Sequence, residues 1–305
     1  MSKDYAACLD IGGTFIKYAL VDINGNIIDL KKQKTSKKGK DGLLTQVFGI
    51  IEEMLNSSGG NVIGIGISSA GQVNHWRGEV LSATDNLPGW EGINLKNVIE
   101  NRYKITCQID NDVKCAALGE MHFGAAKNVK DFVCITIGTG VGGAVVENGR
   151  LLRGNNGIAG EVGHMIIRIG GRKCNCGNYG CYEQYASVTA LKATVARKLG
   201  KTYLPYDTGV EWLFERYNQD ERLKAIIDRY AEDVALGIVS LVNIANPSFV
   251  IVGGAVSSSR LLMDKVVELA YQRVLPVFKR DLKIVSALKG NNASLLGVST
   301  YIFKH

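Results

Sequence analysis

Short apolar runs separated by polar turns fill the first part of the chain. They predict strands at residues 5–9, 15–22 and 27–34. The turn between the last two contains Asn24-Gly25, and Asn-Gly between alternating runs is a strong signal for a tight hairpin. We therefore expect the chain to open with three antiparallel strands.

The pattern then changes to a helical period. Residues 43–55 place their apolar side chains on one side of a helix. Apolar runs at 62–68 and 105–109 predict buried strands, and residues 113–123 predict a second helix. Strands that alternate with helices in this way are typical of the α/β class.

The second half repeats the opening pattern. An apolar strand at 132–137 leads into glycines, and the strands 144–147 and 150–152 follow, joined by Asn148-Gly149. Long helical patterns at 187–199 and 220–245 precede a strand at 249–252. This weak internal repeat predicts two related α/β domains, 1–120 and 121–290.

Composition supports a folded protein and sets few limits on partners. The 305 residues are 46% hydrophobic and 21% charged, which argues against disorder. The net charge of +7 suits phosphate-bearing ligands without requiring nucleic acid. Polar residues and Pro247 interrupt the most apolar stretch, 234–256, so we expect no membrane span. The first residues lack a signal-peptide pattern, and we expect a cytoplasmic protein.

Three glycine-rich turns follow predicted strands. They comprise Asp10, Ile11, Gly12, Gly13 and Thr14; then Gly138, Thr139, Gly140, Val141, Gly142 and Gly143; then Gly253, Gly254 and Ala255. Glycine lets backbone N–H groups approach a phosphate, although any one of these segments taken alone is better explained as a tight turn. Asp10 fits either a capped turn or a carboxylate that reaches phosphate through Mg²⁺.

The second glycine turn contains G-x-G-x-x-G, the spacing of dinucleotide-binding loops. Such a loop must open a helix, but a strand pattern follows here, which argues against a Rossmann fold. The sequence contains no G-x-x-x-x-G-K-[ST] either, which argues against a P-loop kinase. The remaining hypothesis is phosphate binding by hairpin turns of two similar domains.

Four residues have the spacing and chemistry of a zinc site. His164, Cys174, Cys176 and Cys181 form H-x9-C-x-C-x4-C within a glycine-rich segment. Three thiolates and one imidazole complete a tetrahedral site with no open position, so the predicted role of Zn²⁺ is structural. The remaining cysteines lie in apolar segments and are predicted to be buried: Cys8, Cys107, Cys115 and Cys134.

Polar side chains near these features suit a hydroxylated ligand. Asn111 and Asp112 follow a predicted strand, where α/β sheets bind ligands. Asp112 fits a general base, or the N-cap of the next helix. Glu161 and Glu183 flank the predicted zinc ligands, and carboxylates accept hydrogen bonds from sugar hydroxyls.

The combination of these motifs resembles the ROK family of the actin-like ATPase superfamily, which contains repressors and sugar kinases. The matching stretches are LDIGGTFIKYALVD, NLPGW, NDVKCAALGE, ITIGTGVGGAVVENGRLLRG, AGEVGH, CNCGNYGCYE and VIVGGAV. They extend from residue 9 to 256, and Leu295-Leu296-Gly297 also fits.

The resemblance implies two RNase H-like domains that close over a cleft, with the C-terminal helix 291–305 joined to the first. It implies an ATP-dependent hexose kinase in which Asp112 takes the proton from the 6-hydroxyl of the sugar. Asn86, Asn111, Glu161, His164 and Glu183 match sugar-binding positions. ATP-Mg²⁺ is matched by Asp10, Gly12, Gly13, Thr14, Lys17, Gly138, Thr139, Gly140, Gly253 and Gly254.

Two departures from the family pattern leave the sugar open. Ala70-Gly71 stands where Pro-Gly is common, and Lys114 lies in the altered segment 110–114. Glucose is the first expectation and N-acetylmannosamine the second; fructose, N-acetylglucosamine, allose and β-glucosides also belong to the family's range. We expect a homodimer. A sugar-responsive repressor is disfavoured because the first motif begins near residue 9, which leaves no room for a helix-turn-helix domain; an inactive sugar sensor is disfavoured because Asp112 and Asp10 are present.

Overall fold

The chain divides into two compact units, each built from segments distant in sequence. The computed structural model describes residues 3–83, 86–204 and 209–304. Unit 1 comprises Met1–Asn128, Arg153–Ala159 and Asn291–His305, and unit 2 comprises Val129–Leu152 and Gly160–Gly290. Residues 121–128 and 153–159, assigned to the second domain from the sequence, therefore belong to unit 1.

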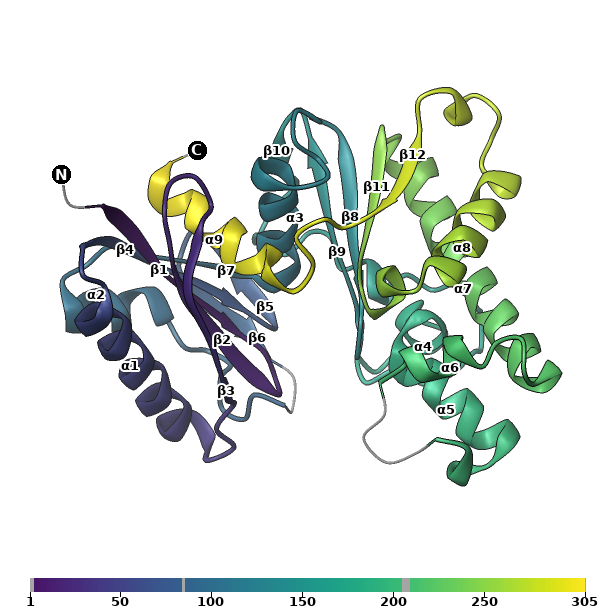
Figure 1. Cartoon of the computed structure of the whole chain (residues 1–305), viewed down its shortest axis with the longest axis horizontal. Coiled ribbons are helices and arrows are strands. Elements are labelled where there is room, and N and C mark those ends of the chain that lie inside the picture. Colours follow the sequence, from purple (N-terminus) through teal and green to yellow (C-terminus); the bar gives the residue numbers. More distant parts are fainter. Residues whose placement is uncertain (1–2, 84–85, 205–208, 305) are drawn as a thin grey trace. The chain divides into compact units, whose positions relative to one another are not determined.

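Unit 1 is built on a five-stranded sheet with the order β3-β2-β1-β4-β7 (Figure 1). The antiparallel strands are β1 (Asp4–Ile11), β2 (Phe15–Val21) and β3 (Ile27–Lys34). Then β4 (Asn61–Ser69) pairs in parallel with β1, and β7 (Cys107–Asn111) in parallel with β4. A small antiparallel pair, β5 (Gln72–Asn74) and β6 (Glu79–Ser82), follows β4.

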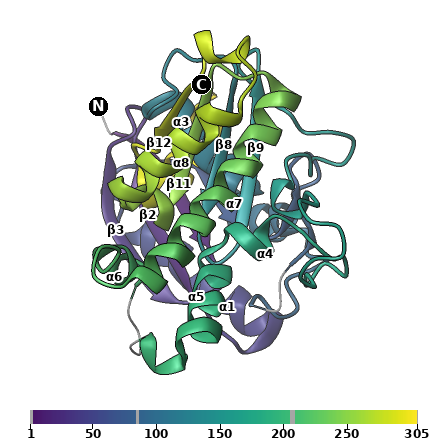
Figure 2. The ribbon, with the colours of Figure 1, turned by 90° about the vertical axis from the view of Figure 1, so that its right-hand side faces the viewer.

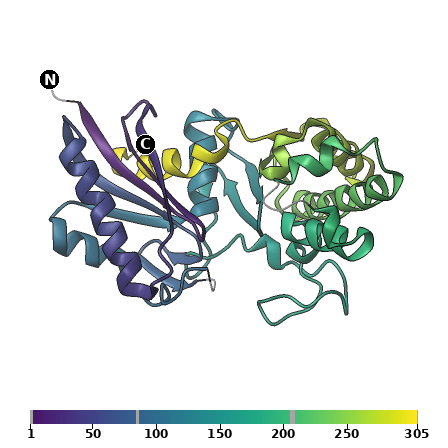
Figure 3. The same ribbon diagram turned by 60° about the horizontal axis from the view of Figure 1, so that its bottom comes forward.

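Both faces of this sheet are covered because side chains alternate along β1. Ala7, Leu9 and Ile11 belong to a core that α1 (Gly39–Ser57) and α2 (Leu95–Tyr103) help to form. Ala6 and Cys8 point to the other face, where they join a cluster with α3 (Asp112–Phe123) and α9 (Ala293–Phe303). In Figure 3, α1 and α9 can be followed along this sheet.

Unit 2 repeats the same sheet, with the order β10-β9-β8-β11-β12. Its strands are β8 (Phe132–Ile137), β9 (Val141–Glu147), β10 (Arg150–Leu151), β11 (Phe249–Gly254) and β12 (Lys283–Ser286). Again the first three are antiparallel, and the last two run parallel to the first. The internal repeat seen in the sequence is thus confirmed as two RNase H-like units of the α/β class.

The helices of unit 2 are visible in Figure 2. They are α4 (Glu183–Ala186), α5 (Val188–Leu199), α6 (Glu211–Glu215), α7 (Glu221–Ala245) and α8 (Arg260–Arg273). Single 3₁₀ turns occur at Val162–His164, Lys201–Tyr203, Ala255–Ser258, Phe278–Arg280 and Gly290–Asn292. Within the described ranges, no helix is long and apolar enough to cross a membrane.

The structure moves the start of one predicted strand and adds elements that the sequence patterns did not predict. β9 begins at Val141 rather than at 144, so Gly142 and Gly143 lie inside a strand and not in a loop. The sequence patterns did not predict α2, because its apolar stripe is narrow: only Leu95 and Ile99 are buried. The helix α8 and the strand β12 were also not predicted.

Candidate functional site

The junction of β7 and α3 presents two polar side chains. Asn111 is the N-cap of α3, because its side-chain oxygen accepts from the backbone N–H groups of Val113 and Lys114. Asp112 is the first residue of the helix, so the N-cap hypothesis for Asp112 is wrong. Its Oδ1 accepts from Asn111 Nδ2 and from Val113 N, each at 2.9 Å.

A buried ion pair anchors the strand that carries this junction. Asp110 is fully buried, and its two carboxylate oxygens accept from Arg153 at 3.1 and 2.8 Å. The Tyr301 hydroxyl donates to Asp110 Oδ2 at 2.5 Å. The cluster ties Arg153 and α9 to the end of β7. The sequence analysis missed it, because residues 43 and 191 positions away from Asp110 give no local signal.

The first glycine turn joins β1 to β2 and is held by charged side chains. Asp10 is buried; it pairs with Lys17 Nζ at 2.8 Å and accepts from Ser68 Oγ at 2.8 Å. A Cβ on Gly13 would lie 2.7 Å from Asn86 Cβ, so glycine allows Asn86 to pack against this turn. The structure thus brings Asn86 to the turn that contains Gly12, Gly13 and Thr14.

The second glycine turn, Gly138 to Gly140, joins β8 to β9. The N–H of Val188, the first residue of α5, donates to the Gly138 carbonyl at 2.9 Å. A Cβ on Gly138 would meet no atom within 4 Å, so the space above this residue is open. Internal packing therefore does not require glycine at this position.

Glu183 lies directly against this turn. Its Oε2 accepts from the backbone N–H of Val141 at 3.0 Å. A Cβ on Gly140 would overlap the same oxygen, so Gly140 is needed for this contact. Because Glu183 follows Cys181 by two residues, the cysteine-rich segment and the glycine turn are joined through one carboxylate.

The third glycine segment lies beside the second. β11 is paired with β8 so that Gly253 is opposite Thr136 and Gly254 opposite Ile137. Gly254 has φ of 81°, and a Cβ there would overlap the Ile137 carbonyl. Unit 2 therefore gathers Gly253, Gly254 and the Gly138 turn at the carboxyl edge of its sheet.

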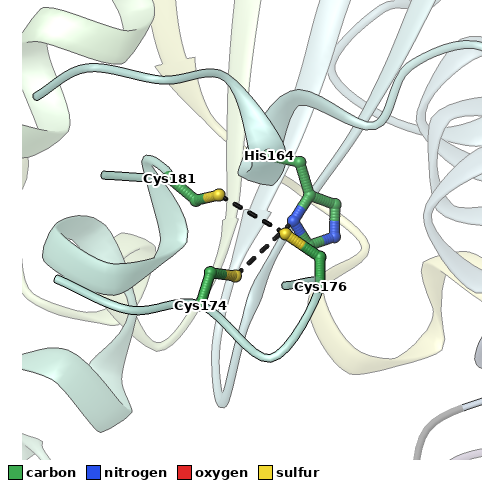
Figure 4. A group of neighbouring side chains, drawn as sticks. All are labelled: His164, Cys174, Cys176 and Cys181. Atoms are coloured by element: carbon green, nitrogen blue, oxygen red, sulfur yellow. Dashed lines mark hydrogen bonds between the residues drawn. The ribbon is translucent and has the colours of Figure 1, made fainter. Parts of the chain in front are cut away.

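The four predicted metal ligands form one cluster. Figure 4 shows the side chains of His164, Cys174, Cys176 and Cys181 pointing toward one another, and their ligand atoms all lie within 4.8 Å. Cys176 and Cys181 sulfurs are 3.6 Å apart, and Cys174 Sγ lies 3.8 Å from His164 Nδ1. A tetrahedral site with Zn–S bonds of about 2.3 Å has neighbouring sulfurs about 3.8 Å apart. The donor set fits zinc in both chemistry and spacing.

The surroundings of the cluster shift the pKa values of Cys176 and Cys181 in opposite directions. A hydrogen bond from the Asn178 backbone is the main effect that lowers the pKa of Cys176 to about 7, which favours a thiolate. Burial raises the pKa of Cys181 to about 12. With Nδ1 of His164 turned to the sulfurs, Nε2 lies 4.0 Å from Glu161 Oε2. The imidazole thus faces the cluster with one nitrogen and Glu161 with the other.

The other four cysteines, predicted to be core residues, are all buried: Cys8, Cys107, Cys115 and Cys134.

The predicted site residues fall into two groups by unit. Unit 1 contains Asp10, Gly12, Gly13, Thr14, Lys17, Asn86, Asn111 and Asp112; unit 2 contains Gly138, Thr139, Gly140, Glu161, His164, Glu183, Gly253, Gly254 and the cysteine cluster.

The amino-acid sequence is similar to those of known proteins along most of its length. A glucokinase from Halalkalibacterium halodurans is 33% identical over 97% of this chain and 94% of its own length. A xylose repressor from Bacillus subtilis is 31% identical over 99% of this chain and 77% of its own length. Sequence similarity of this extent therefore includes both a kinase and a repressor.

The fold is also similar to that of a solved structure over nearly the whole chain. The crystal structure of a ROK family glucokinase from Streptomyces griseus, in complex with glucose and AMPPNP, covers 99% of this chain and 100% of its own, at 29% identity and a TM-score of 0.84. The expected actin-like ATPase fold is confirmed by this match and by the repeated strand order. The sequence matches the ROK family over residues 6–304, and the chain belongs to that family.

Proposed function

We propose that the protein is an ATP-dependent sugar kinase that transfers the γ-phosphoryl group of ATP to the 6-hydroxyl of a hexose. The observation that carries the proposal is the position of Asp112. Its carboxylate stands at the end of β7 and at the first turn of α3, next to Asn111, which caps that helix. The similarity to the Streptomyces griseus glucokinase supports both substrates.

Asp112 is the proposed general base. It accepts the proton of the attacking hydroxyl, and Asn111 Nδ2, which donates to Asp112 Oδ1 at 2.9 Å, fixes the orientation of the carboxylate. Positioned acid–base groups of this kind contribute roughly 10²–10⁴-fold to rate. The buried Asp110–Arg153 pair holds the end of β7 and therefore the base.

The glycine turns are the proposed nucleotide-binding elements. The N–H groups of Gly12 and Gly138 donate within their own turns, to the carbonyls of Phe15 and Gly140. The N–H groups proposed for phosphates are therefore those of Gly13 and Thr14 in unit 1 and of Thr139 and Gly140 in unit 2. Gly253 and Gly254 are assigned to the adenosine. Mg²⁺, when bound with ATP, neutralises charge that develops on the transferred group; Asp10 and Lys17 are the charged side chains of unit 1 assigned to that end of the nucleotide. The residues proposed as ligands belong to both units.

The cysteine cluster is proposed as a structural Zn²⁺ site. His164, Cys174, Cys176 and Cys181 would hold the ion, which when bound cross-links the segment between Glu161 and Glu183. Those two carboxylates, with Asn86 and His164 Nε2, are the proposed acceptors and donors for sugar hydroxyls. Because Glu183 also accepts from Val141, the residue that follows the Gly138–Gly140 turn, the proposed sugar ligands and the proposed phosphate turn are joined by this contact.

Glucose is the proposed sugar, and N-acetylmannosamine is the alternative. The polar side chains assigned to the sugar recognise hydroxyls that both share. Lys114 is buried, and its Nζ donates to the Gly157 carbonyl at 2.7 Å, so it supports the loop at 153–159. The similarity to xylose repressors favours sugar sensing as a second candidate function, which differs by lacking turnover.

One assay tests the reaction and the base together. Turnover is measured by coupled detection of ADP over a panel of glucose, N-acetylmannosamine, fructose and N-acetylglucosamine, with glucose expected to give the highest kcat/KM. Asp112→Asn should lose roughly 10²-fold or more in kcat and still bind the sugar in calorimetry. The matched control is Asp264→Asn, an exposed carboxylate on α8, which should leave turnover unchanged.

The possible results separate the hypotheses. Binding of a sugar without any turnover in the wild-type protein would favour the sensor. Turnover that survives in Asp112→Asn would show that another group takes the proton.

A further inference from the structure

A cavity of about 200 Å³ in unit 2 has five cationic side chains among the eleven residues that line it. Its walls come from the segment before Cys174 and from α4, α5 and α7. The cations are Arg168, Arg172, Arg197, Lys198 and Arg229, and one carboxylate, Asp233, faces them. None of the residues assigned above to ATP, sugar or zinc lines this cavity.

The single carboxylate does not balance these charges. Asp233 is buried and forms an ion pair with Arg168; its Oδ1 also lies 3.6 Å from Arg229, which pairs with Glu232 as well. Within the described residues, Arg172, Arg197 and Lys198 form no ion pair. Several like charges gathered around a small cavity repel one another unless an anion joins them.

Two of the guanidinium groups are held in place before any ligand arrives. Arg172 donates to the Gln184 carbonyl at 2.7 Å and to Thr194 Oγ1 at 3.1 Å. Both Arg168 and Arg172 lie over the ring of Tyr185, at 4.3 and 4.8 Å from its centroid. A guanidinium has five N–H donors, and these contacts use only two on Arg172. Fixed donors lose little entropy on binding.

We propose that this cavity is a binding site for a small phosphate-bearing anion, distinct from the nucleotide site. Guanidinium forks match the oxygens of a phosphate, which accepts several charge-assisted hydrogen bonds at once. The volume is below the roughly 300–1,000 Å³ of pockets for drug-sized ligands, so it suits free phosphate or a short phosphate monoester rather than a nucleotide.

The site adjoins the cysteine cluster through the chain itself. Arg172 precedes Cys174 by two residues, and its backbone N–H donates to the Tyr185 hydroxyl at 2.7 Å. Gln184, whose carbonyl accepts from Arg172, also directs its side-chain amide to Cys174 Sγ at 3.6 Å. An anion held by Arg172 therefore contacts the same segment that carries the proposed zinc ligands.

The proposal is tested by titrating the full-length protein calorimetrically with sodium phosphate and, separately, with glycerol phosphate, at an ionic strength kept constant with sodium chloride. Arg197→Gln should weaken phosphate binding about tenfold, and Arg197→Glu should weaken it further. Arg197 is chosen because it is exposed and forms no ion pair within the described residues, so the variants should remain folded. Tighter binding of glycerol phosphate than of phosphate would identify a monoester as the ligand class, and the reverse would identify the free ion.

Arg273→Gln is the matched control, because Arg273 is exposed at the end of α8 and its guanidinium donates to the Leu269 carbonyl of its own helix. It should bind phosphate as the wild type does. Phosphate bound at the nucleotide site would be indifferent to Arg197, so equal affinities in the wild type and Arg197→Glu would overturn the proposal. Absence of saturable binding in the wild type would overturn it as well.

Discussion

At the scale of single residues, the arrangement at the end of β7 depends on one buried carboxylate and its partners. Asp110 is fully buried, and Arg153, whose side chain is 14% exposed, provides its counter-charge. The residues Asn111 and Asp112 were predictable, because polar residues that follow a strand in an α/β pattern indicate a site. Their roles were not, since a sequence does not show whether Asn111 or Asp112 caps the helix.

Replacing Arg153 by methionine should destabilise the protein by about 3–5 kcal/mol, because the change leaves the Asp110 carboxylate buried without a counter-charge. Denaturant unfolding followed by circular dichroism gives the free energy. The control is Arg150→Met, an exposed arginine on β10, which should change the free energy by less than about 0.5 kcal/mol. Equal losses in the two variants would mean that the ion pair is not what matters.

At the scale of elements, the packing of α3 against α9 depends on two glycines. A Cβ on Gly119 of α3 would overlap the carbonyl of Ala293, and a Cβ on Gly297 of α9 would overlap the carbonyl of Cys115. The backbones of the two helices therefore approach more closely than any other residue would allow. The sequence pattern predicted α3, and the family resemblance implied the C-terminal helix, but neither gave a reason to pair residues 119 and 297.

Gly297→Ala should therefore lower the free energy of unfolding by about 1–3 kcal/mol, as expected for overpacking. Gly49→Ala is the opposite case, because Gly49 lies inside α1 and a Cβ there would meet no atom within 4 Å. That substitution should raise stability by up to about 1 kcal/mol through helix propensity. Both values come from the same denaturation experiment. A stabilising Gly297→Ala would contradict the close approach of α3 and α9.

At the scale of the whole molecule, two units have the same strand order, and each contains residues proposed as ligands. In unit 2 the cysteine cluster links Glu161 to Glu183, and Glu183 links it to the glycine turn at Val141. Loss of the proposed metal should therefore affect both the stability and the sugar affinity of the protein.

We expect elemental analysis to find about one zinc ion per chain. Cys176→Ser should lower the zinc content, the thermal midpoint and the affinity for the sugar together. Asn175→Ser, an exposed change in the same loop that removes no ligand atom, should alter none of them. If Cys176→Ser lowered only the thermal midpoint, the proposed coupling between metal and sugar would be wrong.

The sequence by itself determined the class of the fold, the internal repeat and the four metal-ligand candidates. These features depend on periodicity, turn residues and short spacings, which act over a few neighbouring positions. Only the tertiary structure decided that Arg153 and Tyr301 neutralise Asp110, that Glu183 contacts the Gly138 turn, and that four arginines and a lysine surround one cavity. Those contacts join residues far apart in the chain, and packing alone brings such residues together.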